Sequence, residues 1–139
     1  ILVHVGVFIS LLLGVEQEQI LRLFAFSGKS LLTRPYVILT AIFLHIDIAH
    51  LISNVLALLF FGSSVEREIG KKHTLLLFLG GGVLGNLFSL PFYGFDVYFL
   101  GASGGVFALI GAAMLLAPLE LSFYPFLIPW SFWLFILSP

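Results

Sequence analysis

Four residues in strongly apolar surroundings carry groups that could perform chemistry: His45, His50, Asn54 and Ser103. A polar or ionisable side chain inside a membrane span costs about 2–3 kcal/mol unless it is partnered, which makes such residues functional candidates. His50 and Asn54 are four residues apart and share one helix face. His45 and His50 are five apart, about 140° around a regular helix, so we do not expect one such helix to offer both rings to a single ligand or metal.

Ser103 is the candidate nucleophile. It lies in Gly101-Ala102-Ser103-Gly104-Gly105, where the small neighbours allow another backbone or a substrate to approach closely. We expect a helix to begin here, and the free N–H groups of a helix start favour developing negative charge. The serine could attack a carbonyl while its own backbone N–H holds the oxyanion, with His50 and Asn54 as further donors.

The composition around these residues is that of a membrane protein. Of 139 residues, 60% are hydrophobic and 9% are charged, whereas a soluble domain carries about 25% charge. The mean hydropathy is +1.17 and the net charge is −1. These values exclude an ordinary soluble enzyme, a disordered chain and a nucleic-acid binder, which needs a basic face. We therefore expect an all-α polytopic membrane protein, because open strands would leave backbone groups unpaired in hydrocarbon.

Charged and helix-breaking residues divide this single predicted domain, residues 1–139, into apolar segments. The expected helical spans lie near residues 1–14, 37–62, 74–90, 101–117 and 125–138. Residues 15–35 mix charges with apolar side chains, which is typical of a segment in the membrane interface. Both end segments are shorter than the ~20 residues that cross a bilayer, so we expect the sequence to be a piece of a longer protein.

The positive charges predict an orientation. Arg67, Lys71 and Lys72 crowd the loop at 63–73, and the positive-inside rule therefore places this loop in the cytoplasm. The 15–35 connector and the aromatic loop at 92–100 would then lie together on the opposite side.

Small residues predict where helices approach closely. The third span carries Gly81-x3-Gly85, and the fourth carries Gly104-x3-Ala108. Small side chains at this spacing let helix backbones pack tightly in lipid. Such packing could bring Ser103 toward the histidine face of the second span.

The combination of motifs is more specific than its parts. The segment Thr40-x2-Phe43-Leu44-His45-x4-His50-x3-Asn54 resembles the second span of the rhomboid family of intramembrane serine proteases. Gly62-x3-Glu66-Arg67-x2-Gly70 resembles that family's charged loop, and Gly101-Ala102-Ser103-Gly104 resembles its nucleophile motif. The resemblance covers roughly residues 34–118, in the same order and with the same separations.

This resemblance implies a rhomboid-like helical bundle, with about four to five of six expected spans present. Ser103 would be the nucleophile, His50 and Asn54 would stabilise the oxyanion, and His45 would support the site from below. Gly101 and Gly104 would frame the serine. Phe107 takes the place of an aromatic residue, usually tyrosine, that packs against the base. The partners implied are a transmembrane protein substrate and the lipid bilayer, with a prokaryotic cell membrane as the expected location and no cofactor.

The sequence departs from the family pattern in further respects. Tyr36 and Val37 stand where the family usually has Trp-Arg, which bears on how the first loop is anchored. The family's general base is a histidine on a sixth span, and this chain holds no such segment. Neither His4, on another helix, nor His73, in the charged loop, is expected to replace it. Since a serine hydroxyl needs a base, we expect the 139-residue chain alone to be inactive.

Other functions are open at this stage. A catalytically inactive relative that binds membrane clients would use the same fold, although such relatives generally lose the serine or its glycines. A channel or transporter would line a path with the intramembrane His and Asn, but the spans hold few polar residues. A metal site from His45, Asp47 and His50 requires the helix to begin after Asp47, which we expect to act as a helix cap instead. We therefore predict no metal.

Overall fold

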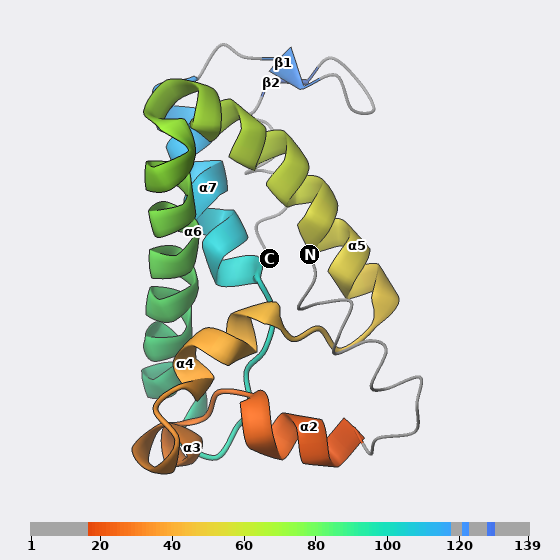
Figure 1. Ribbon diagram of the computed structural model, residues 1–139, viewed down its shortest axis with the longest axis vertical. Coiled ribbons are helices and arrows are strands. Elements are labelled where there is room, and N and C mark those ends of the chain that lie inside the picture. Colours follow the sequence, from red (N-terminus) through yellow and green to blue (C-terminus); the bar gives the residue numbers. More distant parts are fainter. Residues whose placement is uncertain (1–16, 118–120, 123–127, 130–139) are drawn as a thin grey trace.

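The computed structural model describes residues 17–117, 121–122 and 128–129, which are mainly helical (Figure 1). The helices are α2 (Gln17–Phe24), α3 (Gly28–Thr33), α4 (Val37–Thr40), the 3-10 helix η1 (Ala41–Phe43), α5 (Ile48–Ala57), the π-helix η2 (Leu58–Gly62), α6 (Ser63–Tyr93) and α7 (Ser103–Leu116). The predicted span 1–14, His4 and most of the predicted span 125–138 lie outside the described residues.

One short sheet accompanies the helices. Strands β1 (Leu121–Ser122) and β2 (Ile128–Pro129) pair antiparallel, with Leu121 opposite Pro129. Strand β2 falls within segment 125–138, where we expected helix, so the all-helical expectation is wrong at these two residues. Pro129 has no N–H to contribute to a helix ladder, which disfavours an uninterrupted helix here.

The longest feature is a helical run that reverses on itself. Among the described residues, one stretch is long and apolar enough to cross a membrane, the 46 residues Ile48–Tyr93, and α7 is apolar but shorter. Gly70 interrupts the run with φ 78°, and the chain turns back there (Figure 1). Only glycine adopts this conformation without strain. The predicted loop at 63–73 is therefore wrong in extent, because the helix-forming charged residues on both sides of Gly70 remain helical.

Two other predicted boundaries are corrected. The expected helix 37–62 is broken, because α4 and η1 end at Phe43 and α5 begins only at Ile48. The expected end at Leu90 is too early, because α6 continues through Pro91 to Tyr93 and stops at Gly94, which has φ 83°. Pro91 cannot donate to the Leu87 carbonyl, but only two helical residues follow it, so the disturbance is confined to the end of the helix.

Glycines bring α6 and α7 into backbone contact. A Cβ added at Gly81 would lie 2.4 Å from the Cβ of Ala108 and 3.0 Å from the carbonyl oxygen of Gly104. A Cβ at Gly105 would lie 2.4 Å from the carbonyl oxygen of Phe78. The predicted close approach of these two small-residue faces is confirmed. The main hydrophobic core lies at the same helices and includes Phe61, Val65, Leu109 and Ala113. Gly111, by contrast, faces open space.

The connector and the aromatic loop are joined into one unit, which we call the clasp (residues 24–30 and 95–101). Phe26 and Phe99 form an antiparallel bridge with N···O distances of 3.0 and 2.7 Å, and the N–H of Lys29 donates to the Phe95 carbonyl at 3.2 Å. The Lys29 ammonium pairs with Asp96 at 2.5 Å, and this hydrogen bond raises the pKa of Lys29 above its ordinary value.

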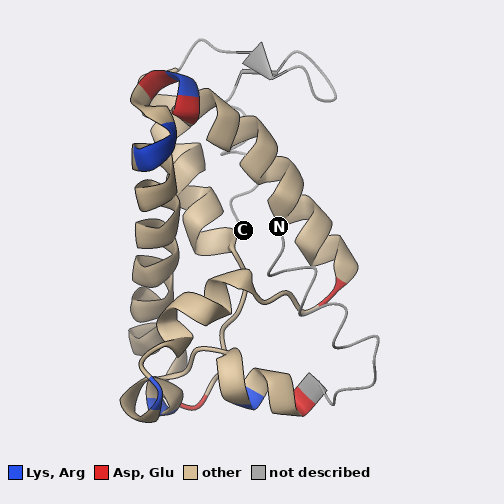
Figure 2. Ribbon diagram, in the orientation of Figure 1, with Lys and Arg blue, Asp and Glu red and all other residues tan. Residues whose placement is uncertain are grey.

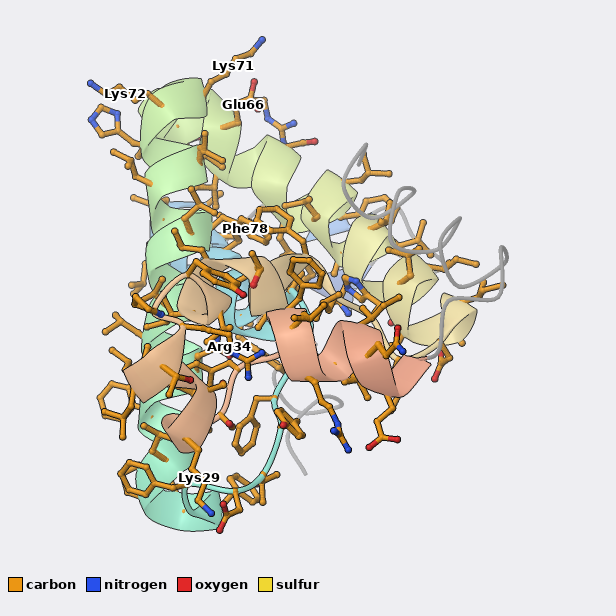
Figure 3. The ribbon with its side chains drawn as sticks, turned by 60° about the horizontal axis from the view of Figure 1, so that its bottom comes forward. Lys29, Arg34, Glu66, Lys71, Lys72 and Phe78 are labelled. Carbon is orange, nitrogen blue, oxygen red and sulfur yellow. The ribbon has the colours of Figure 1, made fainter. Side chains whose placement is uncertain are left out.

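Charged residues gather at the two ends of the molecule. Figure 2 shows one group at the Gly70 turn and another on α2 and the clasp. Asp47 lies apart from both at the start of α5, while α5, α7 and residues 73–93 of α6 carry no Lys, Arg, Asp or Glu. In Figure 3, Lys71 and Lys72 project away from the turn, whereas Phe78 points between the helices and is buried. The connector and the 92–100 loop therefore lie together, opposite the 63–73 segment, as predicted. Large apolar side chains such as Leu75 and Leu84 are exposed between the two ends, a surface suited to hydrocarbon.

The contact between α6 and α7 yields a testable prediction. Gly81→Ala should lower the free energy of unfolding in detergent micelles by about 1–3 kcal/mol, because the new methyl group meets Ala108 and backbone atoms that cannot move aside cheaply. Gly80→Ala is the matched control, since nothing lies within 4 Å of a Cβ there. Equal losses in both variants would contradict the close packing.

Candidate active site

The two histidines lie against each other because the helix between them is interrupted. The side chain of Asp47 accepts the backbone N–H of His50 at 2.7 Å and caps the start of α5, which confirms its predicted role. His45 lies before this cap, outside the helix. The ring centroids of His45 and His50 are 4.9 Å apart and the rings meet edge to face, at 62°. The expectation that the rings diverge is therefore wrong, because it assumed one continuous helix.

The same arrangement bears on the alternative metal site. The helix does begin after Asp47, as that alternative required, but the carboxylate is engaged at the helix cap. Within residues 17–117 and the two short strands, no group of three or more His, Cys, Asp or Glu residues is placed to hold an ion.

Asn54 binds the backbone carbonyl of His50, whereas Asp47 binds its backbone N–H. Its amide nitrogen donates to the His50 carbonyl oxygen at 2.8 Å, one helical turn earlier, and the side chain is buried. His50 and Asn54 both belong to α5, one turn apart, so they share a helix face as their spacing predicted. A second amide hydrogen on Asn54 is available to another acceptor.

The ring of His50 rests on the backbone of Gly101. A Cβ added at Gly101 would lie 2.8 Å from Cε1 and 3.1 Å from Nε2 of His50, and Gly101 has φ 117°. Any other residue would therefore be strained and would collide with the imidazole. The N–H of Gly101 donates to the Ala41 carbonyl oxygen at 2.9 Å, so this residue lies between η1 and His50.

Ser103 is the first residue of α7, as predicted, and is half-buried. The first turn of a helix presents free N–H groups, so the hydroxyl stands where negative charge is favoured. Gly104 holds this turn against α6, because a Cβ there would lie 3.0 Å from the Gly81 carbonyl oxygen. Phe107, one turn further along α7, is 55% exposed and leaves its ring accessible. The histidine pair therefore lies beside Gly101, two residues before the serine that opens α7.

Two polar residues make contacts that the sequence analysis did not predict: Asn86, which it did not single out, and Thr40, which it named only as part of a motif. Asn86 on α6 is buried, and its amide nitrogen donates to the Ile38 carbonyl oxygen at 3.1 Å. The hydroxyl of Thr40 donates to the Phe24 carbonyl oxygen at 2.8 Å and ties α4 to the connector. The rule that selected the histidines, a polar side chain in an apolar span, also applies to Asn86 and could have found it.

Val37 bears on the anchoring of the first loop. It is fully buried and belongs to a core cluster with Phe26 and Ala41. The position that usually carries a positive charge in the family pattern therefore makes an apolar contact with the connector here, while its neighbour Tyr36 is exposed.

The sequence is similar to known proteins of one family. The family model described as "Rhomboid domain" matches residues 32–138. The chain is 42% identical over 80 residues to "Rhomboid protease GluP" and 35% identical over 74 residues to "Putative rhomboid protease YdcA", both of Bacillus subtilis. It is 32% identical over 113 residues to "RHOMBOID-like protein 12, mitochondrial" of Arabidopsis thaliana. These alignments include 58%, 53% and 69% of this chain, which spans only 15%, 37% and 34% of those relatives.

Gly101 and Gly94 provide a matched pair of substitutions. Both have positive φ, but a Cβ at Gly94 meets nothing within 4 Å, whereas one at Gly101 meets His50. Gly94→Ala should cost about 1–2 kcal/mol of unfolding free energy through backbone strain, and Gly101→Ala should cost more because it also displaces the ring. Denaturant titration in micelles measures both losses. If the two losses are the same, His50 does not rest on Gly101.

Proposed function

The chain belongs to the rhomboid family, and from this premise we propose that it forms the core of an intramembrane serine endopeptidase with Ser103 as its nucleophile. Family membership makes it an integral membrane protein. The observation that carries the proposal is the contact between the His50 ring and Gly101, two residues before a serine that opens a helix. A donor-bearing side chain next to the residue that leads into α7 supports an oxyanion site at the start of this helix.

The proposed reaction is acyl transfer in two steps. The Ser103 oxygen attacks the carbonyl carbon of the scissile peptide bond while a base takes the hydroxyl proton, and the departing amine receives a proton. The backbone N–H of Ser103 stabilises the oxyanion, with His50 and Asn54 as further donors. Water then hydrolyses the acyl-enzyme and frees the serine. His45 contributes by holding the ring of His50 through their edge-to-face contact.

The general base belongs to the proposal as well. His50 packs against Gly101 and His45, a position suited to an oxyanion donor rather than to a base. We therefore retain the family-based expectation that the base is a histidine on a further span, outside these 139 residues. Phe107 offers an exposed aromatic surface one turn from the serine against which such an imidazole could pack.

The arrangement in the membrane follows from the charges. We propose that the helical segments before and after Gly70, within Ile48–Tyr93, each cross the bilayer. The Gly70 turn, with Arg67, Lys71 and Lys72, would then lie on the cytoplasmic side. Ser103 then lies toward the opposite face, next to the clasp. Substrates would be transmembrane proteins entering from the lipid, and residues that weaken their helix near the scissile bond would expose its carbonyl.

Serine labelling tests the nucleophile. A fluorophosphonate should label the longer protein in detergent, and Ser103→Ala should abolish that labelling because the reagent reacts with an activated serine hydroxyl and Ser103 is the proposed nucleophile. Ser63→Ala is the control, since this exposed serine lies near the Gly70 turn. Labelling that survives Ser103→Ala would sink the proposal, and a protein that is never labelled would favour the inactive, client-binding relative.

The location of the base is tested by comparing two lengths of the protein. The 139-residue chain should cleave a transmembrane reporter peptide no faster than its Ser103→Ala variant, because an unassisted serine hydroxyl is a poor nucleophile. The longer protein should show Ser103-dependent turnover in the same detergent. Turnover by the 139-residue chain that depends on Ser103 would mean that the base lies within it.

A further inference from the structure

We infer that Asn86, a buried amide on α6, is a positioning residue for the proposed active site. It is not adjacent to Ser103 in sequence, and its hydrogen bond leads to α4. The inference rests on the proposed protease function, and it extends the site to a residue that acts through the backbone of other elements.

The first link joins α6 to the short helical segment that we call the platform, α4 and η1 (Val37–Phe43). The Asn86 amide nitrogen donates to the Ile38 carbonyl oxygen at 3.1 Å. Ile38 belongs to a helix of only four residues, and the carbonyls at a helix end have no partner within the helix. In hydrocarbon a carbonyl without a partner is costly, so this bond favours one placement of the platform on α6.

The second link is steric and lies one turn away on the same face of α6. A Cβ at Gly82 would lie 2.6 Å from Cδ1 of Ile42, a platform residue that is fully buried. Gly82 and Asn86 are four residues apart and share a helix face. The platform therefore packs on one face of α6, where Gly82 leaves room for Ile42 and Asn86 binds the Ile38 carbonyl.

The third link runs from the platform to both sides of the site. The Ala41 carbonyl oxygen accepts the N–H of Gly101 at 2.9 Å, and Gly101 precedes the serine helix. The chain leaves the platform directly into Leu44, which is buried, and then His45, whose ring touches His50. A shift of the platform thus moves Gly101 and the histidine pair together, and catalysis responds steeply to small displacements.

The test compares two substitutions of Asn86 in the longer protein with a matched control. Asn86→Leu keeps approximately the volume and removes the donor. Asn86→Ala removes the donor without adding apolar volume. Thr74→Val is the control, because Thr74 is a buried polar residue on the same helix whose hydroxyl donates only to the Gly70 carbonyl oxygen, near the turn.

Two readouts separate positioning from general stability. Both Asn86 variants should lower kcat on a transmembrane reporter peptide by roughly tenfold to a hundredfold, with KM changed by less than about twofold. Amide hydrogen exchange of Gly101 should become about tenfold faster at temperatures where the protein is fully folded. Thr74→Val should lower the unfolding temperature while leaving kcat and Gly101 exchange unchanged.

The inference is overturned if kcat and Gly101 exchange stay at the wild-type values in both Asn86 variants. It is equally overturned if kcat falls only in proportion to the folded fraction, as for a residue that merely stabilises the fold. If the unaltered longer protein shows no Ser103-dependent turnover, the proposed function fails instead, and Gly101 exchange still decides whether Asn86 holds the platform.

Discussion

Hydrocarbon offers no partner to a backbone N–H or C=O, and the region around Ser103 is shaped by this constraint. Irregular backbone occurs at residues 44–47 and 94–102, between helices that are otherwise regular. Each irregular stretch is paired with a neighbour. Asp47 accepts the N–H of His50, and the Ala41 carbonyl accepts that of Gly101. The pairing that makes broken helices tolerable in lipid is also what brings the serine and the histidines together.

Glycine contributes to the same region in two different ways. Along α6 and α7 it removes side chains so that two backbones touch, with Gly81 facing Gly104 and Ala108. At Gly101 it allows a positive φ and leaves room for an imidazole. The glycine contacts between α6 and α7 fix the axis of the serine helix, and Gly101 lets the His50 ring lie beside the start of that helix. Tight packing of α7 alone would not define the site, because Ser103 could still face lipid.

Sequence reasoning identified the parts of the site better than the backbone that holds them. Asp47 was predicted as a cap, and Ser103 as the start of a helix, because both signals are local and have a direct physical cause. The error at His45 arose from extending one helical period across the whole apolar stretch 37–62. Hydrophobicity keeps a segment in the membrane, but it does not make the segment a single helix. The cap at Asp47 already implied that the helix starts at Ile48. His45 then lies outside this helix, and the 140° separation expected for two residues of one regular helix does not apply to it.

The remaining differences have a similar origin. Gly70 reverses the chain with one residue where a longer loop was expected, and this depends on a φ value that sequence alone does not reveal. The polar side chain of Asn86 within an apolar span could have been noticed, but its partner could not, because the Ile38 carbonyl is 48 residues distant and only the fold brings the two together. Long-range pairing of side chain to backbone leaves no periodic signature, unlike the four-residue spacing of His50 and Asn54.

The lengths of the helices connect this architecture to the proposed chemistry. The leg of α6 after Gly70 has about 23 residues and measures about 34 Å, enough to cross a hydrocarbon layer of about 30 Å. Helix α7 has 14 residues, which corresponds to only about 21 Å. If the two helices end near the same membrane surface at the Gly70 side, Ser103 begins roughly 10 Å below the opposite surface. The loop at 94–102 fills the difference, and the clasp ties it to the connector above the serine. A hydrolytic serine needs water, and a serine at the start of a short helix lies closer to the aqueous surface than one at the middle of the hydrocarbon layer.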